Sequence, residues 1–185
     1  MLSGRAAEHA ARIILAEQMP DADVRDFGKA VGPLVPDVVV INGPTTYVEV
    51  KSLNEKGDLV IRKDQHANIL ASTDPFWYAL LFHPPGIFDR EPHEYIETLL
   101  ATSELLLVKD PRVVAWIVEE HASTLESKQG VARRRRGWEA YEWWRMSAAR
   151  FKEMVAGNSI SMRHSSYGQT AKEQGPSTQV DKSAF

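Results

Sequence analysis

Two apolar runs separated by a turn signal constrain this chain more than any other feature. The first, Asp37–Ile41, ends in four consecutive β-branched residues, which favour a buried strand. The second, Thr46–Ser52, follows the turn residues Asn42-Gly43-Pro44. Two such runs with a short connection predict an antiparallel β-hairpin. The hairpin places Asp37, which opens one strand, near Glu49 on the next strand.

The rest of the chain carries apolar patterns that predict further helices and strands. Spacings of three and four residues predict helices, and short apolar runs bounded by glycine or proline predict strands. The predicted helices are about Ser3–Gln18, Arg62–Ser72, Pro111–Glu120 and Gly137–Val155, and the predicted strands are Val24–Phe27 and Phe76–Phe82. The segment 84–103 is predicted to be a loop or an inserted helix, and Glu104–Lys109 fits either a strand or a helix.

Length and composition predict one folded domain with an extension. The 185 residues are short for two domains that each have a core. We predict a core over 1–125 with an insertion near 84–103, a basic amphipathic helical extension over 126–156, and a disordered, polar tail over 157–185. No window approaches the roughly 18 apolar residues of a membrane span, and the N-terminus lacks a signal-peptide pattern. A soluble, cytoplasmic protein without a membrane segment is expected.

Carboxylates are the best candidates for metal ligation in this sequence. Cysteine is absent, and the histidines, among them His83, His93 and His121, show no metal-type spacing. Mg²⁺ prefers a few carboxylates together with water, which the hairpin acids can supply. Side chains alternate along a strand, so Glu49 and Lys51 project from the same face. A carboxylate-bound Mg²⁺ can support hydrolysis of a phosphodiester. In that reaction a lysine beside the metal could orient the attacking water and contact the scissile phosphate.

These residues resemble the motif of the PD-(D/E)XK nuclease superfamily. Pro36-Asp37 is followed twelve positions later by Glu49-Val50-Lys51, at the end of an apolar strand. The resemblance covers roughly residues 3–83 and implies an α/β, restriction-endonuclease-like fold, a mixed β-sheet flanked by helices. It also implies Mg²⁺ as the cofactor, with Mn²⁺ able to substitute, and hydrolysis of DNA phosphodiesters by a homodimer. The pattern is most similar to archaeal-type Holliday-junction resolvases.

The resemblance also assigns roles to individual residues. It implies that the metal is held by Asp37, Glu49, the backbone carbonyl of Val50, and Glu8, which stands at the edge of the apolar stripe of the first helix. Lys51 and Gln65 complete the predicted catalytic set. The predicted DNA contacts are Ser52, Lys63, Arg133, Arg134, Arg135 and Arg136.

The sequence leaves simpler interpretations and other substrates open. Asp37 could cap a turn, while Glu49 and Lys51 could form an exposed cross-strand pair. Glu8 fits a solvent-facing helical glutamate equally well, and His66 is expected on the surface. The enzyme could cut junctions or a fixed duplex site, or it could be a compact nuclease of mobile-element or phage type. A different class of function, a non-catalytic DNA-binding or assembly protein using the basic extension, predicts metal-independent binding without cleavage.

Charge distribution gives a first testable prediction about DNA contact. The net charge is −3, but residues 128–152 contain eight basic and two acidic residues, a local net charge of +6. Such runs are usually solvated patches, yet clustered arginines suit phosphate contacts that set affinity without reading sequence. Replacing Arg133–Arg136 by alanine is therefore predicted to weaken DNA binding and reduce its dependence on salt, measured by fluorescence anisotropy at several salt concentrations. An unchanged salt slope would contradict this role.

Overall fold

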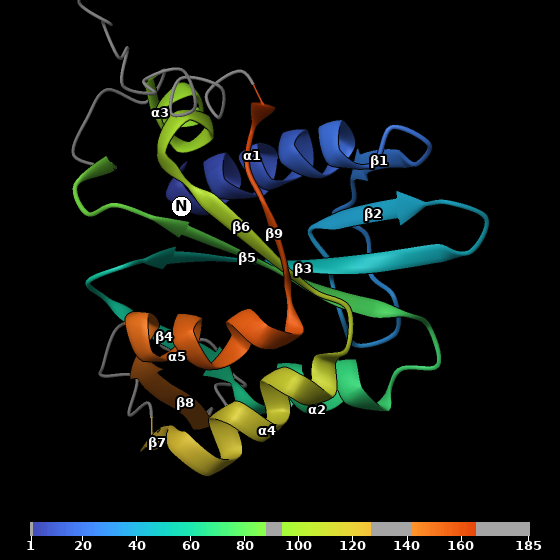
Figure 1. The fold of residues 1–185 in the computed structure, drawn as a ribbon. Coiled ribbons are helices and arrows are strands. Elements are labelled where there is room, and N and C mark those ends of the chain that lie inside the picture. The colour runs from blue at the N-terminus through green and yellow to red at the C-terminus, as the bar shows by residue number, and fades with distance from the viewer. Residues whose placement is uncertain (1, 88–93, 127–141, 166–185) are drawn as a thin grey trace, which may run out of the picture.

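A mixed six-stranded sheet forms the centre of the computed structural model, which describes residues 2–87, 94–126 and 142–165. Figure 1 shows the sheet with helices on both sides. The strand order is β1-β2-β3-β5-β6-β9. The bounds of these strands are β1 Asp23–Asp26, β2 Val38–Ile41, β3 Thr45–Asn54, β5 Phe76–His83, β6 Glu104–Val108 and β9 Ile160–Met162. The predicted α/β class, a mixed sheet flanked by helices, is confirmed.

Two apolar layers hold the helices against opposite faces of this sheet. On one face pack α1 (Leu2–Gln18) and α3 (Tyr95–Thr102), whose apolar side chains share a cluster with those of the central strands. On the other face pack α2 (Lys63–Ala71), α4 (Pro111–His121) and α5 (Ala148–Val155). Figure 1 shows the two groups of helices on either side of the sheet. The result is a three-layer α/β/α arrangement.

The predicted hairpin is confirmed, and its two strands differ in length. Strands β2 and β3 pair antiparallel from Val38↔Val48 to Ile41↔Thr45, and Gly43 adopts the positive φ of 75° that the turn requires. Strand β3 continues to Asn54 beside β5, to which it pairs in parallel. Because β2 begins only at Val38, the edge of β3 beyond Val48 has no β2 partner. This free edge is where the candidate site forms.

The predicted helix over Gly137–Val155 is wrong in its first described part. Glu142–Ser147 is a strand, β8, which pairs antiparallel with β4 (Asp58–Arg62) and β7 (Ser123–Glu126) in a second, three-stranded sheet. Trp144 and Met146 alternate toward the core, a period of two that the surrounding three- and four-residue spacings conceal. The helix α5 begins only at Ala148, where Ser147 caps it by accepting a bond from the Arg150 N–H.

The expected disordered tail does not begin at residue 157. Residues 156–158 form a short 3₁₀ turn, and β9 then pairs with β6 at the edge of the main sheet. Met162 is buried there, which gives this polar segment an anchor. Residues 166–185 lie outside the described part of the chain, and the proposed division of the chain into core, extension and tail stays a prediction.

The remaining elements agree with the sequence or decide between its alternatives. The inserted-helix alternative holds for α3, while residues 88–93 lie outside the description. Glu104–Val108 is a strand, in which Leu105 and Leu107 face one apolar cluster and Leu106 the other. Within the described ranges, no helix has the length and apolar character needed to span a bilayer.

Candidate functional site

Asp37 lies just before β2 and binds the free edge of β3. Its backbone N–H donates to the Val48 carbonyl at 3.1 Å, which continues the hairpin ladder by one bond. Its side-chain Oδ2 then accepts the Val50 N–H at 2.7 Å. Val50 is buried, and β2 does not extend far enough to supply a backbone partner for its N–H. Asp37 is therefore held beside β3 through both its backbone and its carboxylate.

Glu49 projects from β3 toward the opposite face of the sheet from Val48 and Val50. It is 4% exposed and its Oε1 accepts two bonds, from Lys51 Nζ at 2.6 Å and from Gln65 Nε2 at 2.7 Å. Gln65 reaches Glu49 from the first turn of α2. The predicted residues Glu49, Lys51 and Gln65 are thus brought together, and Glu49 and Lys51 are not the exposed cross-strand pair of the simpler interpretation.

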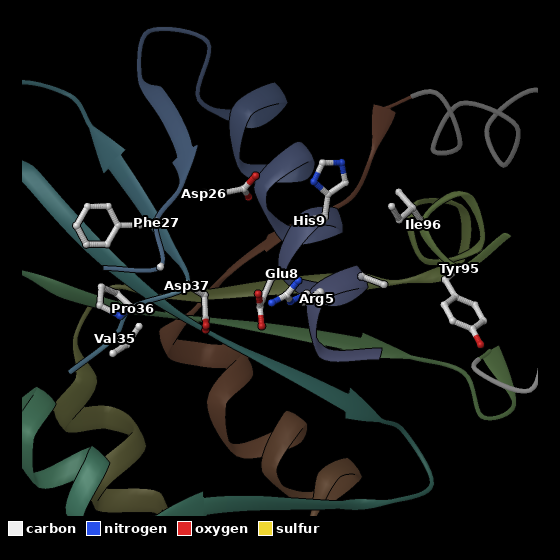
Figure 2. Close-up of a pocket in the computed structure, with 12 residues that line it drawn as sticks. Arg5, Glu8, His9, Asp26, Phe27, Val35, Pro36, Asp37, Tyr95 and Ile96 are labelled. Atoms are coloured by element: carbon white, nitrogen blue, oxygen red, sulfur yellow. The ribbon is translucent and has the colours of Figure 1, made fainter. Parts of the chain in front are cut away.

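Glu8 approaches from α1, on the side of the sheet opposite to Glu49. Figure 2 shows the carboxylates of Glu8 and Asp37 turned toward the same space, with Arg5 beside Glu8. Both acids line a cavity of about 710 Å³ between α1, the segment that precedes β2, and α3. The lining residues are Arg5, Ala6, Glu8, His9, Asp26, Phe27, Gly28, Val35, Pro36, Asp37, Tyr95 and Ile96.

The acidic groups repel one another at this site. Burial raises the pKa of Asp37 to about 7, and the nearby charges of Glu49 and Glu8 add to that increase. The hydrogen bond from Val50 and the charge of Lys51 act in the opposite direction. Burial likewise raises the pKa of Glu8, against the influence of Arg5, with Glu49 contributing to the increase. A positive charge placed among these groups would relieve the repulsion.

The side chains do not form a ready-made metal cage. Among the described residues, no three acidic or histidine side chains are grouped closely enough to hold an ion. One Asp37 oxygen is bound to a backbone N–H, and one Glu49 oxygen is bound to Lys51 and Gln65. Carboxylate oxygens nevertheless suit a hard divalent cation, and the mutual repulsion of Glu8, Asp37 and Glu49 is what a cation would neutralise. The carboxylate oxygens of these three residues are therefore chemically suitable ligands for a divalent cation.

Two histidines occupy positions that the sequence did not indicate. His66 is fully buried, and its Nδ1 lies 2.6 Å from the Tyr78 hydroxyl, so the expected surface location is wrong. Burial lowers the pKa of His66 to about 4. His83 is also buried, with Nε2 3.1 Å from Ser52 Oγ and Nδ1 2.9 Å from the Pro84 carbonyl oxygen. Both pairings join distant segments, so neither leaves a local pattern in the sequence.

The predicted DNA contacts are only partly located. Ser52 is exposed beside Lys51 on β3. The Lys63 ammonium is 3.0 Å from Glu142 and 5.5 Å from the centre of the Trp144 ring, so it also ties α2 to the second sheet. Arg133–Arg136 lie outside the described residues. DNA contact by all of these residues stays a prediction.

Comparisons with known proteins leave the family open. No family model matches the chain, and no curated protein gives a significant match. Among solved structures, the chain is similar to Hjc, a Holliday junction resolvase from the archaeon Archaeoglobus fulgidus, at 12% sequence identity and a TM-score of 0.39. The match covers 83% of this chain and 89% of that one. A likeness this distant assigns no function, so the proposals that follow rest on the residues of this chain.

The raised pKa of Asp37 gives a prediction about stability and pH. Its pKa rises from 3.8 to about 7 on folding, so its contribution to stability is present below pH 4 and is lost as the pH rises through 7. In EDTA, Asp37→Asn is predicted to melt several degrees above the wild type at pH 8, with the gap closing toward pH 5. Asparagine keeps an acceptor for the Val50 N–H but carries no charge. Thermal melts across pH 5–8 measure the gap, and a gap independent of pH would contradict the assignment.

Proposed function

We propose that this protein is a divalent-metal-dependent endonuclease that hydrolyses DNA phosphodiesters. The observation that carries the proposal is the convergence of three acids and one lysine from three separate elements at the free edge of β3. Glu8 comes from α1, Asp37 from the segment before β2, and Glu49 and Lys51 from β3 itself. Mutually repelling carboxylates beside a lysine are costly for stability, which supports a catalytic use of the cluster.

The residues that would hold Mg²⁺ or Mn²⁺ are Asp37, Glu49, Glu8 and the backbone carbonyl of Val50. A bound divalent ion would lower the pKa of a water ligand and neutralise charge on the phosphate. Asp37 is already fixed to β3 through the Val50 N–H at 2.7 Å, so this carboxylate needs little reorganisation. Gln65, 2.7 Å from Glu49 Oε1, would orient the Glu49 carboxylate.

Lys51 is the candidate for contact with the attacking water and the scissile phosphate. Its ammonium now forms an ion pair with Glu49 at 2.6 Å, and its side chain is 21% exposed. A cation bound at Glu49 would weaken this ion pair and leave the ammonium available to a phosphate oxygen. Lys51 would then supply positive charge to the phosphate, whereas without a cation it balances the charge of Glu49. The proposed enzyme acts as a homodimer, which would let it cut both strands of a junction or of a duplex.

Cleavage of labelled DNA tests the proposed activity directly. Four-way junction, linear duplex and single-stranded DNA would each be incubated with Mg²⁺, Mn²⁺ or EDTA. Metal-dependent cutting of at least one substrate is expected, with junction-only cutting identifying a resolvase and cutting at one linear site a restriction-type enzyme. Metal-independent binding without cutting of any substrate would instead support a DNA-binding or assembly protein.

Substitutions at the site separate its chemistry from its contribution to folding. Glu49→Gln and Lys51→Met are each predicted to lower the cleavage rate by about 100- to 1,000-fold, the usual cost of removing one group that stabilises the transition state. Glu153→Gln, at an exposed position of α5, is the matched control and should cleave as the wild type does. Thermal melting identifies any variant that has unfolded. Folded variants at Glu49 and Lys51 with full activity would contradict the site assignment.

A further inference from the structure

A second cavity adjoins the candidate active site along a shared wall. Its volume is about 690 Å³, within the ~300–1,000 Å³ typical of ligand sites. The residues Asp26, Phe27 and Gly28 line both this cavity and the one that contains Glu8 and Asp37. We call it the aromatic groove and define it by Arg25, Phe27, Lys29, Val39 and Tyr47 together with that wall. All of its lining residues come from strands and loops.

The floor of the aromatic groove is a row of side chains across three strands. Arg25 pairs with Val39, and Val39 pairs with Tyr47, so the three side chains share one face of the sheet. This face is opposite to the one on which Val38 and Val40 pack in the cluster with α1. The row thus lies on the sheet face that carries Glu49 and Lys51 further along β3.

Two aromatic rings give the aromatic groove its chemistry. Phe27 and Tyr47 are half-buried, with ring centroids 5.3 Å apart, and Tyr47 in turn contacts Phe76 at 5.4 Å. The Phe27 N–H donates to the Asp37 carbonyl at 2.9 Å, so the ring is anchored to the residue proposed to ligate the metal. Figure 2 shows Phe27 on the side of Asp37 away from Arg5. A strand whose phosphate lies at Asp37 would pass next to these rings.

Positive charge borders the same cavity. Arg25 forms an ion pair with Asp23 and is therefore partly neutralised. Lys29 is exposed, and within the described part of the chain it makes no hydrogen bond or ion pair. Asp26 on the shared wall is engaged by Arg12 of α1 at 3.1 Å, which reduces its repulsion of an anion. Aromatic rings beside cations are the combination that binds single-stranded nucleic acid, through base stacking and phosphate contact.

We infer that the aromatic groove binds an unpaired nucleotide of the DNA strand that is cut, with its base on Phe27 and Tyr47 and its phosphate near Lys29. This inference rests on the proposed nuclease function and narrows its substrate class. Bases inside a continuous duplex are already stacked on one another, so packing one of them against a protein ring first costs the energy of unstacking it. The favoured substrate is therefore DNA with unpaired bases beside the cleavage site, such as a flap, a gap or an open junction.

The test is direct binding in EDTA, which prevents cleavage. The probe is a 12-nucleotide single strand carrying 2-aminopurine, whose fluorescence falls when it stacks, and the comparison is the same sequence as a duplex. Wild-type protein should quench the single-strand probe and bind it more tightly than the duplex. Phe27→Leu should remove the quenching and weaken single-strand binding about tenfold, as expected when one base–aromatic contact is lost. Phe27→Tyr, which keeps a ring, should bind as the wild type does.

Two further variants keep the test decisive. Trp116→Leu removes an aromatic ring that is 57% exposed on α4, away from the aromatic groove, and should leave binding unchanged. Lys29→Gln, at the surface, should lower the salt slope of single-strand binding by about 0.7, the value for one lost phosphate contact. It provides a measurement that does not depend on how Phe27→Leu folds.

Several outcomes would overturn the inference. The first is that folded Phe27→Leu binds single strands as the wild type does and Lys29→Gln has an unaltered salt slope. The second is that duplex binding depends on Phe27 as strongly as single-strand binding does. The third is that the groove variants change the oligomeric state and not DNA binding. The last would show that a second copy of the chain occupies the groove. If the wild type cuts DNA while groove variants bind normally, the groove assignment fails and the nuclease stands. If single-strand binding depends on the groove but no substrate is cut, the groove assignment stands and the nuclease proposal fails.

Discussion

The hydrogen bond from the Val50 N–H to Asp37 Oδ2 is the interaction on which the candidate site depends. Strand β2 begins one residue after Asp37, so β3 is left with an unpaired edge at the point where its motif residues lie. A buried N–H without a partner would be costly, and the Asp37 carboxylate supplies that partner at 2.7 Å. The same bond fixes an acid beside Glu49. One hydrogen bond therefore both gives the Val50 N–H a partner and positions Asp37 in the candidate site.

Positioning these acids conflicts with the stability of the fold. Burial and like charges raise the pKa of Asp37 to about 7, and the Val50 N–H, Lys51, Gln65 and, at Glu8, Arg5 compensate in part. A bound cation would relieve the repulsion among these acids, which links the electrostatics of the free protein to its proposed activity. The aromatic groove is connected to the same acid, because the Phe27 N–H donates a hydrogen bond to the Asp37 carbonyl.

Local patterns in the sequence predicted much of the fold and of the candidate site. The hairpin is a short-range structure with its own turn signal, so its pairing and the closeness of Asp37 to Glu49 followed directly. Gln65 was placed on the helix after the motif strand, and one turn of α2 does bring it to Glu49.

Pairings between distant segments could not be predicted in this way. Strand β8 pairs with β4, about 85 residues earlier in the chain, and β9 joins a sheet edge although it is short and lies in a mostly polar segment. His66 was expected at the surface. Its burial depends on Tyr78 from β5 and Trp144 from β8, which only the folded chain brings to it.

The central proposal, that Glu8, Asp37 and Glu49 bind a divalent cation, is tested most directly by calorimetric titration of the protein with Mn²⁺ at pH 7.5. The account predicts Mn²⁺ binding with proton release, because Asp37 is partly protonated in the metal-free protein. It also predicts that Asp37→Asn abolishes both the binding and the proton release without lowering the melting temperature. Wild-type protein that binds no Mn²⁺, or an Asp37→Asn variant that binds it equally well, would contradict the account.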